Sequence, residues 1–309
     1  MPEALVKFVD PDVTADGKRR ASVPLIALRT LWFNTGTCCN ITCGNCYIES
    51  SPHNDRLVYI TPSDVTPYLD EIEALRLPTE EIGLTGGEPF LNPHVADILE
   101  LCLARGFSAL VLTNGLRPIK RWTARLLELR GRYGDALAIR VSLDHHELSL
   151  HEEERGANTF GPTIEVLKWL STNGFRVNVA GRRRWGGAED EQRAGYAALF
   201  AAEGIAVDAN DPAALVLFPE MDVRADVPEI TTECWGLLHK DPADVMCASS
   251  RMVVKRNGAA SPVVVSCTLL PYDAQFELGA RLADSLGAVK LNHPHCVKFC
   301  VLGGGRCSA

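Results

Sequence analysis

The hydrophobic and polar positions along the chain follow two periods, which predict strands and helices in regular succession. Short, nearly continuous apolar runs fit buried strands, because a strand in a parallel sheet is covered on both faces. Longer stretches, in which apolar residues recur every three or four positions, fit amphipathic helices. The predicted strands are 25–33, 81–87, 108–115, 137–144, 175–182 and 213–219.

Amphipathic helices are predicted between successive strands. One opens at Thr61-Pro62-Ser63-Asp64, which has the residue types that begin a helix, and another closes at Gly174. Strand–helix alternation indicates parallel βαβ units. About six strands are too few for an eight-stranded barrel, so an open doubly wound sheet and an incomplete barrel both fit the pattern. The predicted helices are 65–77, 94–106, 121–132, 159–174 and 189–204.

The alternation stops near Pro219. Residues 252–267 fit a β-hairpin with Asn257-Gly258 near its turn. The tail, residues 291–309, is rich in cysteine and glycine and has little core-forming periodicity. We therefore predict three parts: an N-terminal extension, 1–24; a core domain, 25–225; and a smaller C-terminal domain, 226–309. The C-terminal domain is expected to be held together partly by its cysteines.

The composition is that of an ordinary globular protein. Of 309 residues, 46% are hydrophobic and 23% are charged, which excludes disordered, collagen-like and coiled-coil chains. A formal net charge of -8 argues against an extended nucleic-acid surface. No apolar run approaches the ~18 residues that span a membrane, and the start lacks the apolar core of a signal peptide. We expect a cytoplasmic protein that binds neither nucleic acid nor membrane.

Eleven cysteines depart from this ordinary picture. In a chain of this length they favour metal ligands or catalytic thiols over a disulfide scaffold. Cys102 lies in an apolar helical run and is expected to be a buried core thiol, whereas Cys234 is left undecided. The other nine form two groups: Cys38, Cys39, Cys43 and Cys46; then Cys247, Cys267, Cys296, Cys300 and Cys307.

Cys39, Cys43 and Cys46 form a C-x3-C-x2-C pattern directly after the first predicted strand. Three thiolates in a short loop can hold one face of a zinc or iron–sulfur centre. A closed structural zinc site needs a fourth ligand, whereas a cluster with one unligated iron can bind a substrate or cofactor there. Cys38 is a possible fourth ligand, but adjacent cysteines rarely reach one centre, which favours a spare buried thiol.

A second motif, Leu84-Thr85-Gly86-Gly87-Glu88-Pro89, ends the second predicted strand. Ligands of parallel α/β folds bind beyond such strand ends, and paired glycines let the backbone approach them closely. Taken alone, the motif would be a turn with a solvated glutamate. Its position one βα unit after the cysteine loop favours a binding site instead.

Together these motifs resemble the radical S-adenosylmethionine (SAM) superfamily. The resemblance spans about residues 25–220 and includes three later elements in the family's order: Thr113-Asn114-Gly115, Val141-Ser142-Leu143-Asp144 and Arg155-Gly156-x3-Phe160. It implies a partial (β/α)6 TIM-like barrel with its site at the carboxyl ends of the strands. It also implies an enzyme that reductively cleaves SAM to a 5′-deoxyadenosyl radical, which abstracts hydrogen from a small-molecule or peptide substrate. An external donor such as flavodoxin or ferredoxin would supply the electron.

The resemblance assigns cofactor contacts to several residues. Cys39, Cys43 and Cys46 would ligate a [4Fe-4S] cluster. Two alternatives stay open, since Asp144 could cap the next segment and Arg182 could begin a solvated charge run. The family usually has an aromatic residue where this chain has Asn45. The implied adenine contact is therefore assigned to the next aromatic residue, Tyr47. The implied SAM contacts are Gly86, Gly87 and Glu88 to the amine; Ser142 and Asp144 to the ribose; Asn114 to the methionine or ribose; Arg182 to the carboxylate; and Tyr47 to the adenine.

No catalytic residue is assigned from the sequence. His145 and His146, after the fourth strand, and Glu220, after the last, are candidate substrate contacts or general acid/base groups. An ordinary loop position is the favoured interpretation for each of them.

The C-terminal cysteines resemble the auxiliary-cluster modules called SPASM and twitch domains. This implies one auxiliary [4Fe-4S] cluster, with the favoured ligands Cys247, Cys267, Cys296 and Cys300, while Cys307 could replace either of the last two. Zinc on the same thiolates is the alternative, and His293 and His295 are minor candidate ligands. The competing hypothesis for the whole chain is a non-catalytic zinc-binding interaction protein on the same βα scaffold. The few residues before the first strand weakly favour a small molecule, or a peptide that a separate partner captures.

Overall fold

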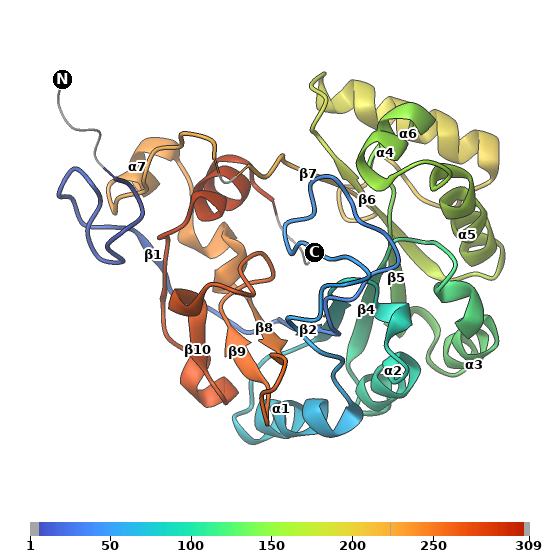
Figure 1. The fold of residues 1–309 in the computed structure, drawn as a ribbon, viewed down its shortest axis with the longest axis horizontal. Coiled ribbons are helices and arrows are strands. Elements are labelled where there is room, and N and C mark those ends of the chain that lie inside the picture. Colours follow the sequence, from blue (N-terminus) through green and yellow to red (C-terminus); the bar gives the residue numbers. More distant parts are fainter. Residues whose placement is uncertain (1–5, 223, 306–309) are drawn as a thin grey trace.

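The computed structural model describes residues 6–222 and 224–305. Its main feature is a nine-stranded sheet in the order β10-β9-β8-β2-β3-β4-β5-β6-β7 (Figure 1). From β2 to β7 every neighbouring pair is parallel. These strands are β2 (Thr30–Asn34), β3 (Glu81–Thr85), β4 (Ser108–Thr113), β5 (Leu137–Ser142), β6 (Arg176–Arg182) and β7 (Leu215–Phe218).

The order of the parallel strands decides between the two architectures that the sequence pattern allowed. Strands β2 to β7 follow one another in the sheet as they do in the chain. A doubly wound sheet reverses direction part-way through its strand order, whereas a barrel does not. The predicted partial (β/α)6 barrel is therefore confirmed, and its two sheet edges within the described residues are β7 and β10.

The helices between these strands form an outer layer on one side of the sheet (Figure 1). The predicted start of the first helix is confirmed: Thr61 and Asp64 form a capping box in which each side chain accepts from the other's backbone N–H. A short helix after β5 was not predicted. The helices of the layer are α1 (Pro62–Ala74), α2 (Val95–Ala104), α3 (Thr123–Tyr133), α4 (Leu148–Arg155), α5 (Phe160–Thr172) and α6 (Glu189–Glu203).

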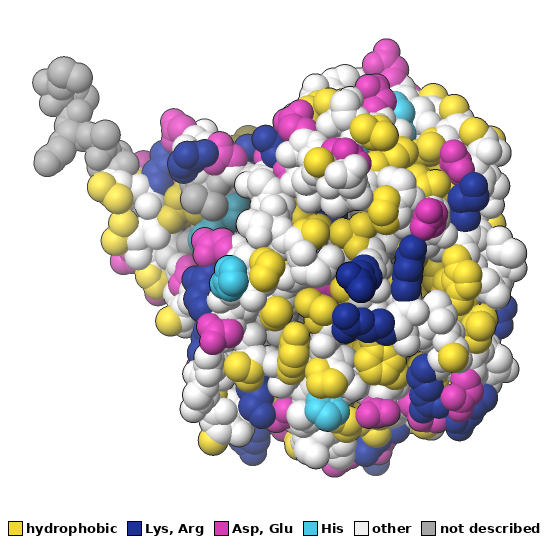
Figure 2. All heavy atoms as spheres, turned by 45° about the vertical axis from the view of Figure 1, so that its right-hand side comes forward, with side chains coloured by type: hydrophobic (Ala, Val, Ile, Leu, Met, Phe, Trp, Pro, Cys, Tyr) yellow, Lys and Arg dark blue, Asp and Glu magenta, His cyan; other side chains and the backbone are white. Residues whose placement is uncertain are grey.

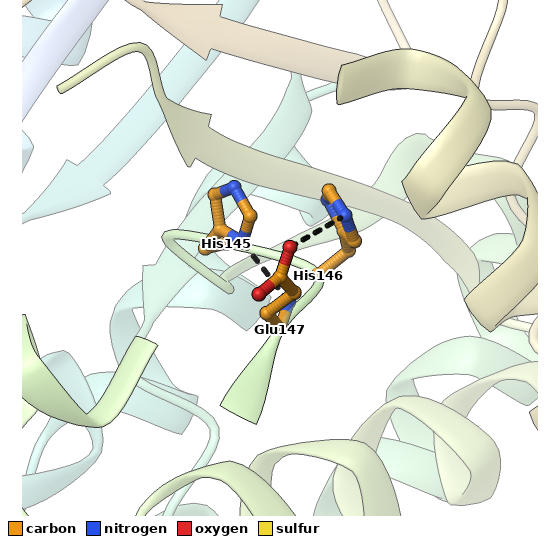
Figure 3. Close-up of side chains that lie close together, drawn as sticks. All are labelled: His145, His146 and Glu147. Atoms are coloured by element: carbon orange, nitrogen blue, oxygen red, sulfur yellow. Dashed lines mark hydrogen bonds and ion pairs between the residues drawn. The ribbon is translucent and has the colours of Figure 1, made fainter. Parts of the chain in front are cut away.

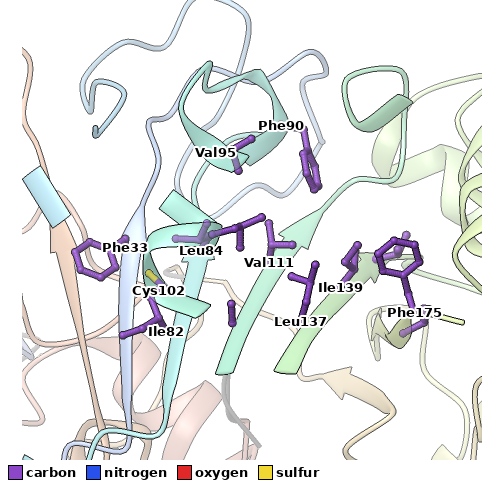
Figure 4. Packing of buried hydrophobic residues seen from close by; sticks show 14 of the residues in the cluster. Phe33, Ile82, Leu84, Phe90, Val95, Cys102, Val111, Leu137, Ile139 and Phe175 are labelled. Carbon is purple, nitrogen blue, oxygen red and sulfur yellow. The ribbon is translucent and has the colours of Figure 1, made fainter. Parts of the chain in front are cut away.

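Two apolar cores cover the two faces of the sheet. Between the sheet and the outer helices lie residues such as Phe33, Val111 and Ile139, and Cys102 is buried among them as predicted (Figure 4). The other face of the same strands, which includes Trp32 and neighbouring side chains, packs against the C-terminal part of the chain. Burial on both faces explains why these strands read as continuous apolar runs.

The C-terminal part extends the sheet. The predicted hairpin is confirmed: β8 (Ser250–Val254) and β9 (Val263–Val265) are antiparallel, and Asn257-Gly258 lies in their connection. Strand β8 is also parallel to β2, and β10 (Glu277–Gly279) continues the sheet beyond β9. A separate pair joins β1 (Ser22–Val23) to β11 (Val289–Lys290). The division at residues 24 and 225 stays a prediction.

The tail, whose sequence has little core-forming periodicity, nevertheless contributes buried apolar residues. Residues Cys296–Leu302 form a π-helix in which Val297, Phe299 and Val301 are buried. Phe299 contacts Phe218 at the end of β7, with ring centroids 5.6 Å apart. The low periodicity agrees with this geometry, because a π-helix does not follow the 3.6-residue period of an α-helix.

Short helical segments complete the described chain. They are α7 (Cys234–Leu238) and the 3-10 turns Pro89–Leu91, Ile119–Trp122, Gly134–Ala136, Pro242–Asp244, Met246–Ala248, Ala274–Phe276 and Leu282–Ser285.

The surface carries charges of both signs. In Figure 2, Lys and Arg side chains lie among Asp, Glu and hydrophobic side chains across the face shown. Among the described residues, none of the helices combines the length and apolar character needed to cross a bilayer.

Candidate functional site

The loop after β2 carries the three cysteines of the C-x3-C-x2-C pattern, and it lies between the parallel strands and the C-terminal part of the chain (Figure 1). Cys39, Cys43 and Cys46 all line one pocket of about 110 Å3 at the carboxyl ends of the strands. Cys38 does not line it, and its sulfur lies toward Pro52. The structure therefore brings together the three cysteines that the spacing singled out, and it leaves Cys38 apart from them.

Burial keeps two of these thiols, Cys39 and Cys43, protonated until a metal displaces the proton. Burial is the main cause that raises the pKa of Cys39 to about 12, and the nearby Glu88, Cys43 and Cys46 contribute to this rise. Burial also raises the pKa of Cys43, although Arg155 acts against this. A soft cation is the partner that favours the thiolate form of such a group. Three thiols facing one pocket thus fit a thiolate-bound metal centre with one open position.

The glycine turn after β3 packs directly against the cysteine loop. A Cβ on Gly86 would lie less than 3.0 Å from the carbonyl oxygen of Gly36, and one on Gly87 would lie equally close to that of Cys38. Gly86 also has φ +135°, which side chains rarely adopt. The Gly87 N–H donates to the Gly36 carbonyl oxygen at 2.8 Å. Glycine is required here so that two backbones can meet beneath the pocket.

Glu88 is not among the residues that line the pocket, and its expected contact with the amine of a bound ligand stays a prediction. Its carboxylate is buried and accepts from the Thr113 hydroxyl (2.9 Å), the Asn114 N–H (2.8 Å) and the Phe90 N–H (3.1 Å). Burial raises the pKa of Glu88 to about 7. The structure therefore gives Glu88 the task of joining the glycine turn to the end of β4.

Asp144 is likewise not among the residues that line the pocket. Its carboxylate is buried and accepts from Arg155 Nε at 2.7 Å, and Arg182 Nε lies 3.7 Å away. Burial acts to raise the pKa of Asp144, but Arg155 and Arg182 outweigh it and hold that pKa below its ordinary value. The two arginines pair with this carboxylate, and its expected contact with the ribose stays a prediction.

The remaining expected cofactor residues do line the pocket. Asn114 lies above the cysteine loop, where its side-chain N–H donates to Asn40 at 2.9 Å and lies 3.7 Å from the Cys39 sulfur. Arg182 donates to the Asn45 carbonyl oxygen at 3.1 Å, which ties β6 to the loop. The full set of expected residues in the lining is Cys39, Cys43, Cys46, Tyr47, Gly86, Gly87, Asn114, Ser142 and Arg182.

Arg155, at the end of α4, also lines the pocket, and sequence reasoning gave it no role. Its guanidinium brings positive charge beside the thiols, while Asp144 fixes its orientation. The sequence signal was the Arg155-Gly156 pair, but its 11-residue separation from Asp144 gives no hint that the two side chains meet.

A second group of cysteines gathers in the C-terminal part. Cys247, Cys267 and Cys296 lie close enough to influence one another. Burial first, and then the neighbouring cysteines, raise the pKa of Cys247 to about 12 and raise that of Cys296 well above its ordinary value. Cys300 is one turn after Cys296 on the π-helix. Arg251 is buried beside them and donates to the Cys247 carbonyl oxygen. Cys307, the fifth expected ligand, lies outside the described residues.

His145, His146 and Glu147 form a third group, after β5 (Figure 3). Their ligand atoms lie within 4.8 Å of one another. However, His145 Nδ1 accepts from the Glu147 N–H at 3.0 Å, and a metal on either nitrogen of that ring would oppose this hydrogen bond. The two rings instead stack on each other between Trp185 and Tyr196. Aromatic packing accounts for this group.

Known families and relatives match the part of the chain that forms most of the pocket. The family whose model matches the chain is the Radical SAM superfamily, over residues 33–182. The antilisterial bacteriocin subtilosin biosynthesis protein AlbA of Bacillus subtilis (strain 168) is 31% identical over 169 residues, which cover 54% of this chain and 35% of that protein. The mycofactocin maturase MftC of Mycobacterium ulcerans (strain Agy99) is 26% identical over 137 residues, which cover 44% and 35%. The chain thus spans about a third of the length of these relatives.

Solved structures share the fold. Streptococcus suis SuiB bound to S-adenosylmethionine superposes with a TM-score of 0.59 at 14% identity, covering 83% of this chain and 64% of that chain. SuiB bound to its precursor peptide SuiA gives 0.56 at 14% identity, covering 84% and 63%. At such low identity, these likenesses show the fold alone.

Proposed function

The chain carries a radical SAM domain over residues 33–182, and from this premise we propose that it is a radical SAM enzyme with an auxiliary iron–sulfur cluster. The observation that carries the proposal is the meeting of Cys39, Cys43 and Cys46 in one pocket with the glycine turn and Arg182. The alternative of a non-catalytic zinc-binding protein gains no support from the comparisons.

Three thiolates would hold three irons of a [4Fe-4S] cluster and leave the fourth iron for SAM. When bound, the reduced cluster supplies the electron that cleaves SAM to methionine and a 5′-deoxyadenosyl radical. Arg155 and Arg182 would offset the negative charge of the thiolates and of the SAM carboxylate. Ile41, Ile48 and Leu112 give the pocket apolar walls that exclude water from a reactive radical.

The residues around SAM divide into contacts and supports. The backbone of Gly86 and Gly87, with Asn114, Ser142, Arg182 and Tyr47, is proposed to contact the cofactor, since all of these line the pocket. Glu88 and Asp144 are proposed as supports, because their carboxylates are already hydrogen-bonded within the protein.

The auxiliary cluster is proposed on Cys247, Cys267, Cys296 and Cys300, with Cys307 as the alternative ligand. The proximity of the first three supports this assignment, and the buried guanidinium of Arg251 would balance the charge of four thiolates. Zinc on the same residues is the competing occupant.

A peptide is the proposed substrate. The relatives are named for bacteriocin biosynthesis and for maturation, and SuiB was solved with a precursor peptide. A cavity of about 450 Å3 beside the cysteine loop, between the two groups of cysteines, is large enough to admit a side chain of such a peptide. An external electron donor such as flavodoxin or ferredoxin completes the proposal.

Anaerobic reconstitution tests these assignments. The wild-type protein is expected to bind roughly eight irons, four for each cluster, and to form 5′-deoxyadenosine from SAM with dithionite. A variant with Cys39, Cys43 and Cys46 changed to alanine should keep roughly four irons and form none. A colourless, zinc-containing wild-type preparation would contradict the proposal.

A further inference from the structure

Asn45, between Cys43 and Cys46, is held by three separate parts of the chain. Its N–H donates to Glu154 Oε1 at 2.8 Å, and its carbonyl oxygen accepts from Arg182 Nη2 at 3.1 Å. Its side-chain N–H donates to Glu220 Oε1 and lies 3.4 Å from the Met221 carbonyl oxygen. Every hydrogen-bonding function of its backbone, and its amide N–H, therefore has a partner on α4, on β6 or after β7.

The contact with α4 is rigid. The Glu154 side chain is fully buried, and its carboxylate also pairs with Arg182 and Arg184. The Glu154 carbonyl oxygen accepts from the Gly44 N–H at 2.8 Å. Because a buried carboxylate with these partners cannot move cheaply, it fixes the backbone of the loop on one side.

Glu220 provides the contact on the opposite side. Its Oε1 receives Asn45, whereas its Oε2 is buried and has no hydrogen-bond partner among the described residues. Glu220 lines the cavity of about 450 Å3, together with Lys298 from the π-helix. Cys46 and Tyr47 line this cavity as well as the SAM pocket. The Asn45–Glu220 bond thus connects the loop of the first cysteine group to the wall of a second cavity.

We propose that Asn45 and Glu220 are a positioning pair, which sets the placement of Cys46 and thereby the geometry of the cluster and of SAM. The inference rests on the proposed function and goes beyond it, because it assigns a role to a residue at which this chain departs from the family's usual aromatic.

The pair is tested first by breaking the hydrogen bond and then by exchanging its donor and acceptor. In Asn45→Asp two carboxylates face each other, and their repulsion is expected to displace the loop. We expect the dissociation constant of SAM, measured by titration of the reconstituted protein, to rise about tenfold, the effect of losing one charge-assisted hydrogen bond. The electron paramagnetic resonance spectrum of the reduced cluster should change as well.

The matched variants separate positioning from general damage. Glu220→Gln retains an acceptor for Asn45 and should stay within about twofold of wild type in SAM affinity. The double variant Asn45→Asp/Glu220→Gln restores the bond with donor and acceptor exchanged, so it should recover both the affinity and the spectrum. Glu153→Gln, at the exposed neighbour of Glu154, is the control and should change neither.

The result that would overturn the pair is an Asn45→Asp protein with wild-type SAM affinity and spectrum, or a double variant that is no better than Asn45→Asp. Iron content and thermal unfolding show whether each variant has folded. A wild-type protein that binds no cluster would instead defeat the proposed function itself.

Discussion

The close approach of two backbone segments at Gly87 predicts that a larger residue is not tolerated there. In Gly87→Ala the new Cβ would lie less than 3.0 Å from the Cys38 carbonyl oxygen, and backbone atoms cannot yield as a flexible side chain can. We expect a loss of stability of about 2–3 kcal/mol and incomplete iron loading, measured by urea unfolding and iron content.

Gly161→Ala is the control for that substitution. Gly161 lies in α5, and a Cβ added there would meet no heavy atom within 4 Å. Alanine there should stabilise the protein by about 0.5–1 kcal/mol. Equal effects of the two substitutions would contradict the argument from close packing.

The pKa of Glu88 predicts a pH dependence. Burial raises the pKa of this carboxyl in the folded protein to about 7, above the ordinary value of 4.5. The folded state therefore binds the proton more tightly than the unfolded chain does. The contribution to stability is fully present below about pH 4.5 and is lost as the pH rises to about 7, by up to roughly 3 kcal/mol.

Urea unfolding of the metal-free protein between pH 5 and 8 measures this dependence. Glu88→Gln cannot titrate, so its curve should be flatter, and its stability deficit relative to wild type should shrink as the pH rises. Parallel curves for the two proteins would show that Glu88 is not the titrating group.

Residue identities alone located most of the pocket. The cysteines and glycines were predicted from motif and spacing, and Asn114, Ser142 and Arg182 from the resemblance to the family; the structure brings them all to one place. The direction of a carboxylate was not predictable. Glu88 and Asp144 turn inward because Thr113 and Arg155, from other elements, offer them hydrogen bonds.

At the scale of elements, the capping box of α1 is the clearest case of local sequence fixing local structure. Thr61→Ala removes the side chain that accepts from the Asp64 N–H. We expect a loss of about 1 kcal/mol in the free energy of unfolding, measured by urea titration. Thr172→Ala, at the exposed end of α5, is the comparison and should change stability by less than about 0.5 kcal/mol. An equal loss of stability in both variants would show that the Thr61 side chain does not stabilise the helix as a cap.

Long periodic elements were predictable and short ones were not. The segments 159–174 and 189–204 match α5 and α6, because three or more turns display a clear apolar stripe. Helix α4 is only eight residues long and mostly polar, and the π-helix at Cys296–Leu302 does not follow the 3.6-residue period. The π-helix is buried against the surrounding chain through Val297, Phe299 and Val301, whereas α4 is anchored by only two buried residues, His151 and Glu154.

At the scale of the whole molecule, the C-terminal part completes the core of the barrel. Strand β8 pairs with β2, and Met252 and Val254 share a buried cluster with Trp32, Leu110 and Ala138. A chain cut after residue 225 would expose that cluster. It would also make β2 an edge strand, paired with β3 on one side only.

We therefore expect residues 1–225 alone to aggregate or to remain partly unfolded, whereas the full chain is monodisperse and folded. Size-exclusion chromatography and near-ultraviolet circular dichroism distinguish these outcomes. A well-folded, monodisperse fragment with cooperative thermal unfolding would favour the predicted boundary as a true division between independent domains.

The sequence by itself determined the chemistry and the order of the elements, because ligand spacing and apolar periodicity are properties of neighbouring residues. It specified the C-x3-C-x2-C loop, the glycine turn and six strands separated by helices. The folded arrangement was needed to show that Glu88 and Asp144 pair with other elements, that Arg155 joins the pocket wall, and that Glu154 and Glu220 hold Asn45 from two sides. Those outcomes depend on pairing between groups that are far apart in the chain, and burial selects such pairs only once the chain has folded.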